Sequence, residues 1–121
     1  MFYHYRQNNS GGSFILDDDV TVHVIIEAES AEQADRRAES IGIYFDGCSN
    51  GMDCPCCGDR WTSQYNKGDK EPLVYGENPQ AFADSDLGIR WWGEKPAVYI
   101  YYANGDKKAI YSNKQMRGIK C

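Results

Sequence analysis

The chain has 121 residues, 41% of them hydrophobic, and a formal net charge of −5 at pH 7. This length fits one domain over residues 1–121, which buries about two-thirds of its unfolded surface and needs neither a metal nor disulfides merely to fold. The negative charge argues against broad binding to nucleic acid or anionic membranes, because phosphate recognition needs clustered Lys and Arg. Residues 105–121 form a short basic tail, which we expect to pair with the acidic body.

Targeting signals and membrane spans are not expected. The first residues, MFYHYRQNN, contain no basic stretch followed by an apolar one, and no apolar run approaches the roughly 20 residues of a membrane span. We therefore expect a cytoplasmic protein without a membrane partner. In a reducing compartment, clustered cysteines are metal ligands or reactive thiols more often than disulfides.

Two strands are predicted before residue 29. FYHYRQ, residues 2–7, alternates so that Phe2 and His4 face one way and Tyr3 and Tyr5 the other. VTVHVII, within residues 20–28, is rich in β-branched side chains and favours a central strand. Its predicted core-facing positions are Val20, Val22, Val24 and Ile26.

The clearest predicted helix runs from Ala31 to about Ile41. Ser30 is placed to cap it, and Gln33 stands where a capping box expects Glu or Gln. One apolar stripe consists of Ala31, Ala34, Ala38 and Ile41. Such small side chains allow a helix to lie close to a sheet.

A β-hairpin is predicted over residues 98–112, with Asn104-Gly105 at its turn. This dipeptide favours a two-residue type I′ turn, which sets Tyr102 opposite Lys107. We therefore expect an α+β fold. It combines a mostly antiparallel sheet of four to six strands, one principal helix on one face, and a cysteine-rich loop that resembles a zinc knuckle.

The segment DCPCCGDRW, residues 53–61, contains the C-P-x-C-G pattern of zinc knuckles. Two cysteines three positions apart on a tight turn direct both sulfurs to one point, and glycine lets the backbone fold around the metal. A structural zinc site needs four ligands, and the predicted set is Cys48, Cys54, Cys56 and Cys57. The alternatives to Cys56 as the fourth ligand are Cys121, His4 and His23.

Two other interpretations of these cysteines remain open. Cys54 and Cys57 have the spacing of a redox dithiol, but such motifs usually open a helix, and Gly58 and Asp59 are poor residues for that position. The second interpretation is that the cysteines are inert thiols, either buried or free.

Two further segments are candidate binding elements. Trp91 and Trp92, preceded by Arg90, point to opposite faces if they lie on a strand, so we expect at least one ring to pack in the core. An exposed ring beside Arg90 has the composition of an interface anchor or a stacking platform. The NNSGGS loop from Asn8 to Ser13 offers backbone N–H groups to an anion or a nucleotide. It lacks the spacings of the phosphate-binding motifs, so an ordinary connection is favoured.

Three stretches, YRQNNSGG, AESAEQADRRAESIGIYFDG and DCPCCGDRW, together resemble a group of small uncharacterised proteins of tailed bacteriophages. The resemblance covers roughly the first half of the chain and implies no catalytic residue. It implies a context, that of an intracellular phage accessory product engaged in host takeover or in inhibition of a bacterial defence system.

The predicted function is that of a non-enzymatic protein whose zinc loop holds an irregular surface rigid for binding a host protein. An acidic body suits competition for a basic surface on that partner. The alternative is a protein that binds or sequesters a small molecule such as a nucleotide, or a small enzyme, through the loop from Asn8 to Ser13.

Overall fold

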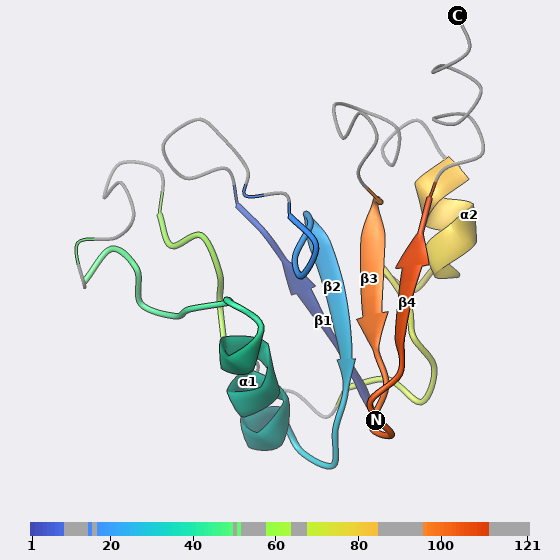
Figure 1. The fold of residues 1–121 in the computed structure, drawn as a ribbon, viewed down its shortest axis with the longest axis horizontal. Helices are drawn as coiled ribbons and strands as arrows, with labels where there is room; N and C mark the ends of the chain where they lie inside the picture. Colours follow the sequence, from blue (N-terminus) through green and yellow to red (C-terminus); the bar gives the residue numbers. More distant parts are fainter. Residues whose placement is uncertain are drawn as a thin grey trace, which may run out of the picture.

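The computed structural model describes residues 1–8, 15, 17–49, 51, 58–63, 68–84 and 96–111. Their fold is a four-stranded sheet between two helices (Figure 1). The elements in chain order are β1 (Phe2–Arg6), β2 (His23–Glu27), α1 (Ala31–Ser40), α2 (Pro79–Asp84), β3 (Val98–Tyr101) and β4 (Lys107–Ile110). The spatial order is β1-β2-β3-β4, with β1/β2 and β3/β4 antiparallel and β2/β3 parallel. The α+β class with one principal helix is confirmed.

The face of the sheet that α1 covers holds the first hydrophobic cluster. Tyr3 and Tyr5 of β1 lie opposite Ile26 and Val24 of β2, and all four side chains are buried. The predicted alternation in β1 is confirmed, because the neighbouring His4 faces the other side. The buried members of this cluster are Tyr3, Tyr5, Val20, Val24, Ile26, Ala28, Ala34, Ala38, Ile43 and Trp61.

The β2 strand is buried on both faces, which the sequence did not predict. Val24 and Ile26 pack under α1, whereas Ile25 belongs to a second cluster on the opposite face. Val22 also belongs to that second cluster, so its predicted place on the same side as Val24 is wrong. The regular alternation begins only at His23, where the strand itself begins.

The α1 helix begins as its sequence predicts. The hydroxyl oxygen of Ser30 accepts the backbone N–H of Gln33 at 3.1 Å, and the Gln33 side chain accepts the N–H of Glu29 at 2.7 Å. Ala34 and Ala38 are fully buried, and their small size lets the helix approach the sheet closely.

Arg37 of α1 fastens the helix to the ends of two strands. Its guanidinium donates to the carbonyl oxygen of Glu27 at 2.6 Å and to that of Tyr102 at 2.9 Å. The chain near the end of β2 is thereby joined to the chain that leaves β3.

The hairpin of β3 and β4 has a different register from the predicted one. Tyr101 lies opposite Lys107, and the N–H of Tyr102 donates to the carbonyl of Asp106, so the loop has three residues. Gly105 has φ +95°, and its N–H donates to the carbonyl of Tyr102. This is a three-residue turn with a glycine bulge, a hairpin connection that is second in frequency to the two-residue turn. The predicted pairing of Tyr102 with Lys107 is therefore wrong by one residue.

The opposite face of the sheet is covered by α2 and the chain that precedes it. The backbones of Val74 and Glu77 form two mutual hydrogen bonds, of 2.9 and 3.0 Å, which close a tight turn. The second cluster consists of Val22, Ile25, Val74, Phe82, Ala83, Ala97, Val98, Ile100 and Ile110. Neither helix in the described part of the chain has the length and apolar character of a membrane span.

Candidate functional site

Buried Gln7, just beyond the end of β1, holds together both ends of the loop that follows it. Its side-chain oxygen accepts the N–H of Ile15 at 2.6 Å, and its amide nitrogen donates to the Ile15 carbonyl at 2.9 Å. The same nitrogen donates to the carbonyl of Thr21 at 3.2 Å. A buried amide with its hydrogen bonds satisfied is a rigid support. Gln7 therefore fixes Ile15 next to the end of β1.

The cysteine segment is closed in a similar way. The backbone N–H of Cys48 donates to a carboxylate oxygen of Asp59 at 2.9 Å. The N–H of Asn8 donates to the carbonyl of Arg60 at 2.8 Å, which attaches the end of this segment to the start of the other loop. Residues 48 and 59 are thus held side by side, and the two loops share one base.

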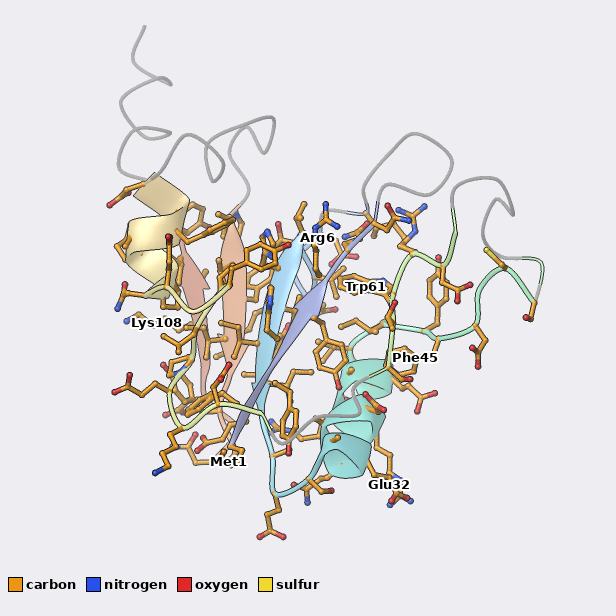
Figure 2. All side chains as sticks on the ribbon, turned by 180° about the vertical axis from the view of Figure 1, so that it is seen from behind. Met1, Arg6, Glu32, Phe45, Trp61 and Lys108 are labelled. Carbon is orange, nitrogen blue, oxygen red and sulfur yellow. The ribbon has the colours of Figure 1, made fainter. Side chains whose placement is uncertain are left out.

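Arg60 and Trp61 anchor this base in the body of the protein. Arg60 is 8% exposed, and its guanidinium donates to the Tyr44 hydroxyl at 3.1 Å and to the Gln7 side-chain oxygen at 3.0 Å. Trp61 is 1% exposed and packs in the cluster under α1. In Figure 2 it lies on the same side of the sheet as Phe45, away from Lys108. We call Gln7, Asp59 and Arg60 the loop base.

Gly58, which follows the second knuckle cysteine, has φ +88°. Only glycine adopts this left-handed conformation readily, which accounts for the glycine at this position. An added Cβ would meet the Asn8 side chain at 3.6 Å, which is ordinary contact. The constraint on this position is therefore conformational.

Of the predicted zinc ligands, the structure describes Cys48, which is half-buried. Cys54, Cys56, Cys57 and the alternative Cys121 lie outside the described residues. The described parts of the chain contain no group of three or more possible metal ligands. Since three of the four predicted ligands are not among them, the predicted site stays a prediction.

His4 and His23 contact each other on the face of the sheet that α2 covers. Nε2 of His4 and Nδ1 of His23 are 2.8 Å apart, and the ring centroids are 5.0 Å apart with planes inclined by 24°. This centroid separation is close to the nitrogen distance plus the two ring radii, so the rings meet edge to edge in one N–H···N hydrogen bond. Tyr75 and Phe82 pack edge-on against His23.

This pair is held neutral. Burial lowers the pKa of His4 to about 4 and that of His23 to about 3, and the nearby positive charge of Arg6 adds to both effects. The nitrogens that face each other are engaged in their own hydrogen bond. The structure thus brings the two histidines into contact with each other. Their role as alternative zinc ligands stays a prediction, because Cys54, Cys56 and Cys57 lie outside the described residues.

Arg90, Trp91 and Trp92 also lie outside the described residues, so the predicted aromatic binding element stays a prediction. The loop base was not predicted from the sequence. Asp59 and Arg60 follow the knuckle directly, which is a weak signal, but the role of Gln7 depends on contacts across 8 and 53 positions of sequence.

A family model described as Domain of unknown function (DUF7296) matches residues 1–118 of the chain. No curated protein and no solved structure matches it.

Proposed function

Since the chain belongs to the DUF7296 family, whose description names no activity, we propose its function from its own geometry. It is a non-enzymatic binding protein in which a zinc-stapled loop, residues 48–59, presents a rigid surface to a protein partner. The hydrogen bond between the Cys48 N–H and the Asp59 carboxylate carries this proposal, because it draws the first predicted ligand to the end of the knuckle.

Zinc would be held by Cys48, Cys54, Cys56 and Cys57. Four thiolates suit a closed tetrahedral structural site, and zinc bound there stabilises a loop without taking part in a reaction. Cys121, His4 and His23 remain the alternatives to Cys56. The left-handed Gly58 and the half-buried Cys48 both suit such a loop.

The proposed partner is a host protein with a basic surface. Among the described residues, exposed acidic side chains outnumber exposed basic ones about two to one. Charge complementarity speeds association and rejects acidic partners. The resemblance to tailed-phage proteins supplies the context of an accessory protein, acting in the host cytoplasm, that modulates host takeover or a defence system. Arg90, Trp91 and Trp92 are proposed as additional contacts.

Metal analysis and affinity capture test the two halves of this proposal separately. Protein purified without added zinc should contain about one zinc per chain, and Cys54→Ser should lower this content strongly. Less than about a tenth of one zinc in a folded protein would rule out the site.

For the partner, wild-type bait should retain one dominant host protein from a bacterial lysate, and Cys54→Ser bait should not. The matched control is Ser63→Ala, an exposed change just beyond the loop. Equal capture by the Cys54→Ser bait would show that partner binding does not depend on the zinc loop. It would overturn the proposal that this loop binds the partner.

A second candidate function rests on the hydrogen bonds that close residues 8–14. A loop whose ends are fixed by a buried amide offers preorganised backbone N–H groups to an anion such as a nucleotide. Mass spectrometry of molecules released by denaturation would detect a retained nucleotide. Retained nucleotide without a protein partner would favour this second function over the first.

A further inference from the structure

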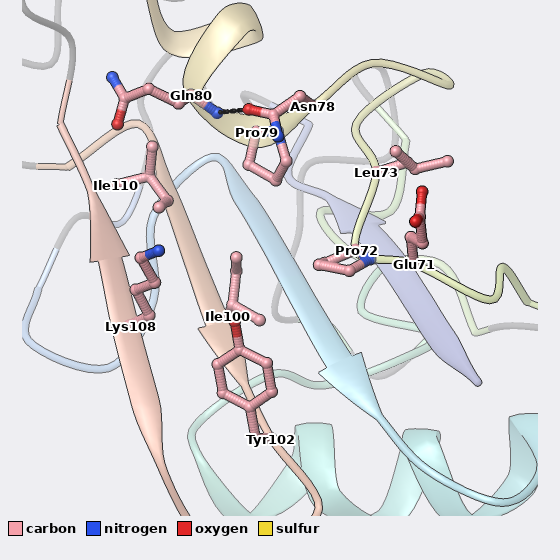
Figure 3. Close-up of a pocket in the computed structure, with 10 residues that line it drawn as sticks. All are labelled: Glu71, Pro72, Leu73, Asn78, Pro79, Gln80, Ile100, Tyr102, Lys108 and Ile110. Carbon is pink, nitrogen blue, oxygen red and sulfur yellow. Dashed lines mark hydrogen bonds between the residues drawn. The ribbon is translucent and has the colours of Figure 1, made fainter.

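A cavity of about 480 Å³ lies on the face of the sheet that α2 covers (Figure 3). Trp61 packs on the opposite face, in the cluster under α1. The floor of the cavity is the α2 face of β3 and β4, and its walls are the chain from Glu71 to Leu73 and the start of α2. Pockets for small ligands typically have about 300 to 1,000 Å³. The volume is therefore sufficient for a molecule the size of a dipeptide.

The walls of this cavity are held in place by hydrogen bonds. The Asn78 side-chain oxygen accepts the N–H of Gln80 at 2.9 Å and that of Ala81 at 3.3 Å, which fixes the first turn of α2. The Gln80 side chain donates to the carbonyl of Tyr111 at 2.8 Å and so joins α2 to the end of β4. A preformed cavity loses less free energy of ordering when a ligand binds.

The lining combines an apolar floor with two opposite charges. Ile100 and Ile110 rise from β3 and β4, while Lys108 and Glu71 stand on opposite sides of the space in Figure 3. Neither of these two charged side chains has an ion pair or hydrogen bond with any residue in the described part of the chain.

The neighbouring Lys107 provides a contrast. Its side chain lies on the other face of the hairpin, where it donates to the carbonyl of Asp18 and lies 4.4 Å above the Tyr99 ring. Adjacent lysines on a strand face opposite ways, so Lys107 is engaged and Lys108 is available.

We propose that this cavity binds a short apolar peptide that has a free amino group at one end and a free carboxyl group at the other. The carboxylate of the ligand pairs with Lys108, its ammonium pairs with Glu71, and its apolar body lies on Ile100 and Ile110. A polyanion such as a nucleotide would meet a single lysine with a carboxylate opposite, which disfavours it. This inference is independent of the zinc loop.

The test is an NMR titration of the full-length protein with the dipeptide Leu-Leu. We expect saturable shifts of the Ile100 and Ile110 methyl signals, with a dissociation constant in the millimolar range or below. N-acetyl-Leu-Leu lacks the ammonium and Leu-leucinamide lacks the carboxylate, and each should bind about twofold to fivefold more weakly than Leu-Leu.

Two pairs of matched variants test which side chain binds each charged end of the peptide. Lys108→Gln should weaken Leu-Leu binding and abolish the advantage of the free carboxylate, whereas Lys107→Gln should leave binding unchanged. Glu71→Gln should abolish the advantage of the free ammonium, with exposed Glu77→Gln as its control.

Three results would overturn the proposal. The first is the absence of methyl shifts at about 10 mM Leu-Leu, well above the expected range. The second is equal affinity for the free and the capped dipeptides. The third is an equal effect of Lys107→Gln and Lys108→Gln in proteins whose spectra show the wild-type fold.

Discussion

The histidine pair makes folding stability depend on pH. In the unfolded chain both side chains titrate near pH 6.5, whereas burial in the folded state lowers the pKa of His4 to about 4 and that of His23 to about 3. Between these values the unfolded state binds more protons than the folded state. Acidification therefore favours unfolding, and the stabilisation is complete only above about pH 6.5.

We expect the free energy of unfolding to fall by about 2 kcal/mol per histidine between pH 7 and pH 5. Urea denaturation at both pH values measures this change. The double variant His4→Gln/His23→Gln replaces the pair by side chains that do not titrate and should show a much smaller dependence. An unchanged pH profile in the double variant would mean that other groups cause the effect.

The Asp59 carboxylate closes the cysteine segment through its hydrogen bond with the Cys48 N–H. Asp59→Ala should lower the free energy of unfolding by about 1 to 2 kcal/mol, because the partly buried N–H loses its acceptor. The dissociation constant for zinc should rise about tenfold, since groups that support metal ligands contribute to affinity on that scale.

Asp59→Asn is the matched variant for this test, because the amide oxygen can still accept the N–H. Competition with a chromophoric chelator measures zinc affinity, and thermal unfolding measures stability. Similar zinc affinity in the alanine variant, the asparagine variant and the wild type would show that loop closure does not support the metal.

Among the secondary-structure elements, those with one buried face were predicted best. In β1 the tyrosines alternate with residues that face the other side, and α1 has a single alanine stripe, so periodicity alone identified both core faces. In β2 both faces are buried, and a continuous apolar run contains no information on which side is which. The parallel pairing of β2 with β3 was also beyond local signals, because it joins residues about 75 positions apart.

The register of the β3/β4 hairpin depends on the conformation of Asn104. In a two-residue type I′ turn Asn104 would have positive φ, and glycine would be accommodated well there. In the structure Asn104 is not among the residues with positive φ, and its side-chain oxygen accepts the N–H of Asp106 at 3.0 Å.

Asn104→Gly should therefore lower the free energy of unfolding by about 0.5 to 1 kcal/mol, through lost hydrogen bonding and a more flexible unfolded chain. Chemical denaturation measures the change. Gly105→Ala is the companion variant and should also destabilise, because Gly105 has φ +95°. A stabilising effect of Asn104→Gly would indicate the two-residue turn and the other register.

On the scale of the whole molecule, the sheet separates two candidate binding regions. The loop base and Trp61 belong to the side that α1 covers, and the cavity belongs to the side that α2 covers. Knuckle spacing is a local property, so the sequence could suggest a zinc site, which stays a prediction because residues 52–57 lie outside the described ones. The sequence did not predict the cavity, whose lining joins residues 71–80 to residues 100–110 through tertiary packing alone.

Because Arg60 and Trp61 are buried in the body, we expect zinc to stabilise the loop without being required for the sheet. Removal of zinc with a chelator should then loosen residues 48–59 and leave the four strands intact. Hydrogen exchange should become faster at the amide of Cys48, whereas the amides of Val24 and Ile26 in β2 should stay protected. Re-addition of zinc to the chelated protein is the control, and it should restore slow exchange at Cys48. Unfolding of the sheet along with the loop, as in zinc fingers that depend on their metal, would contradict this separation.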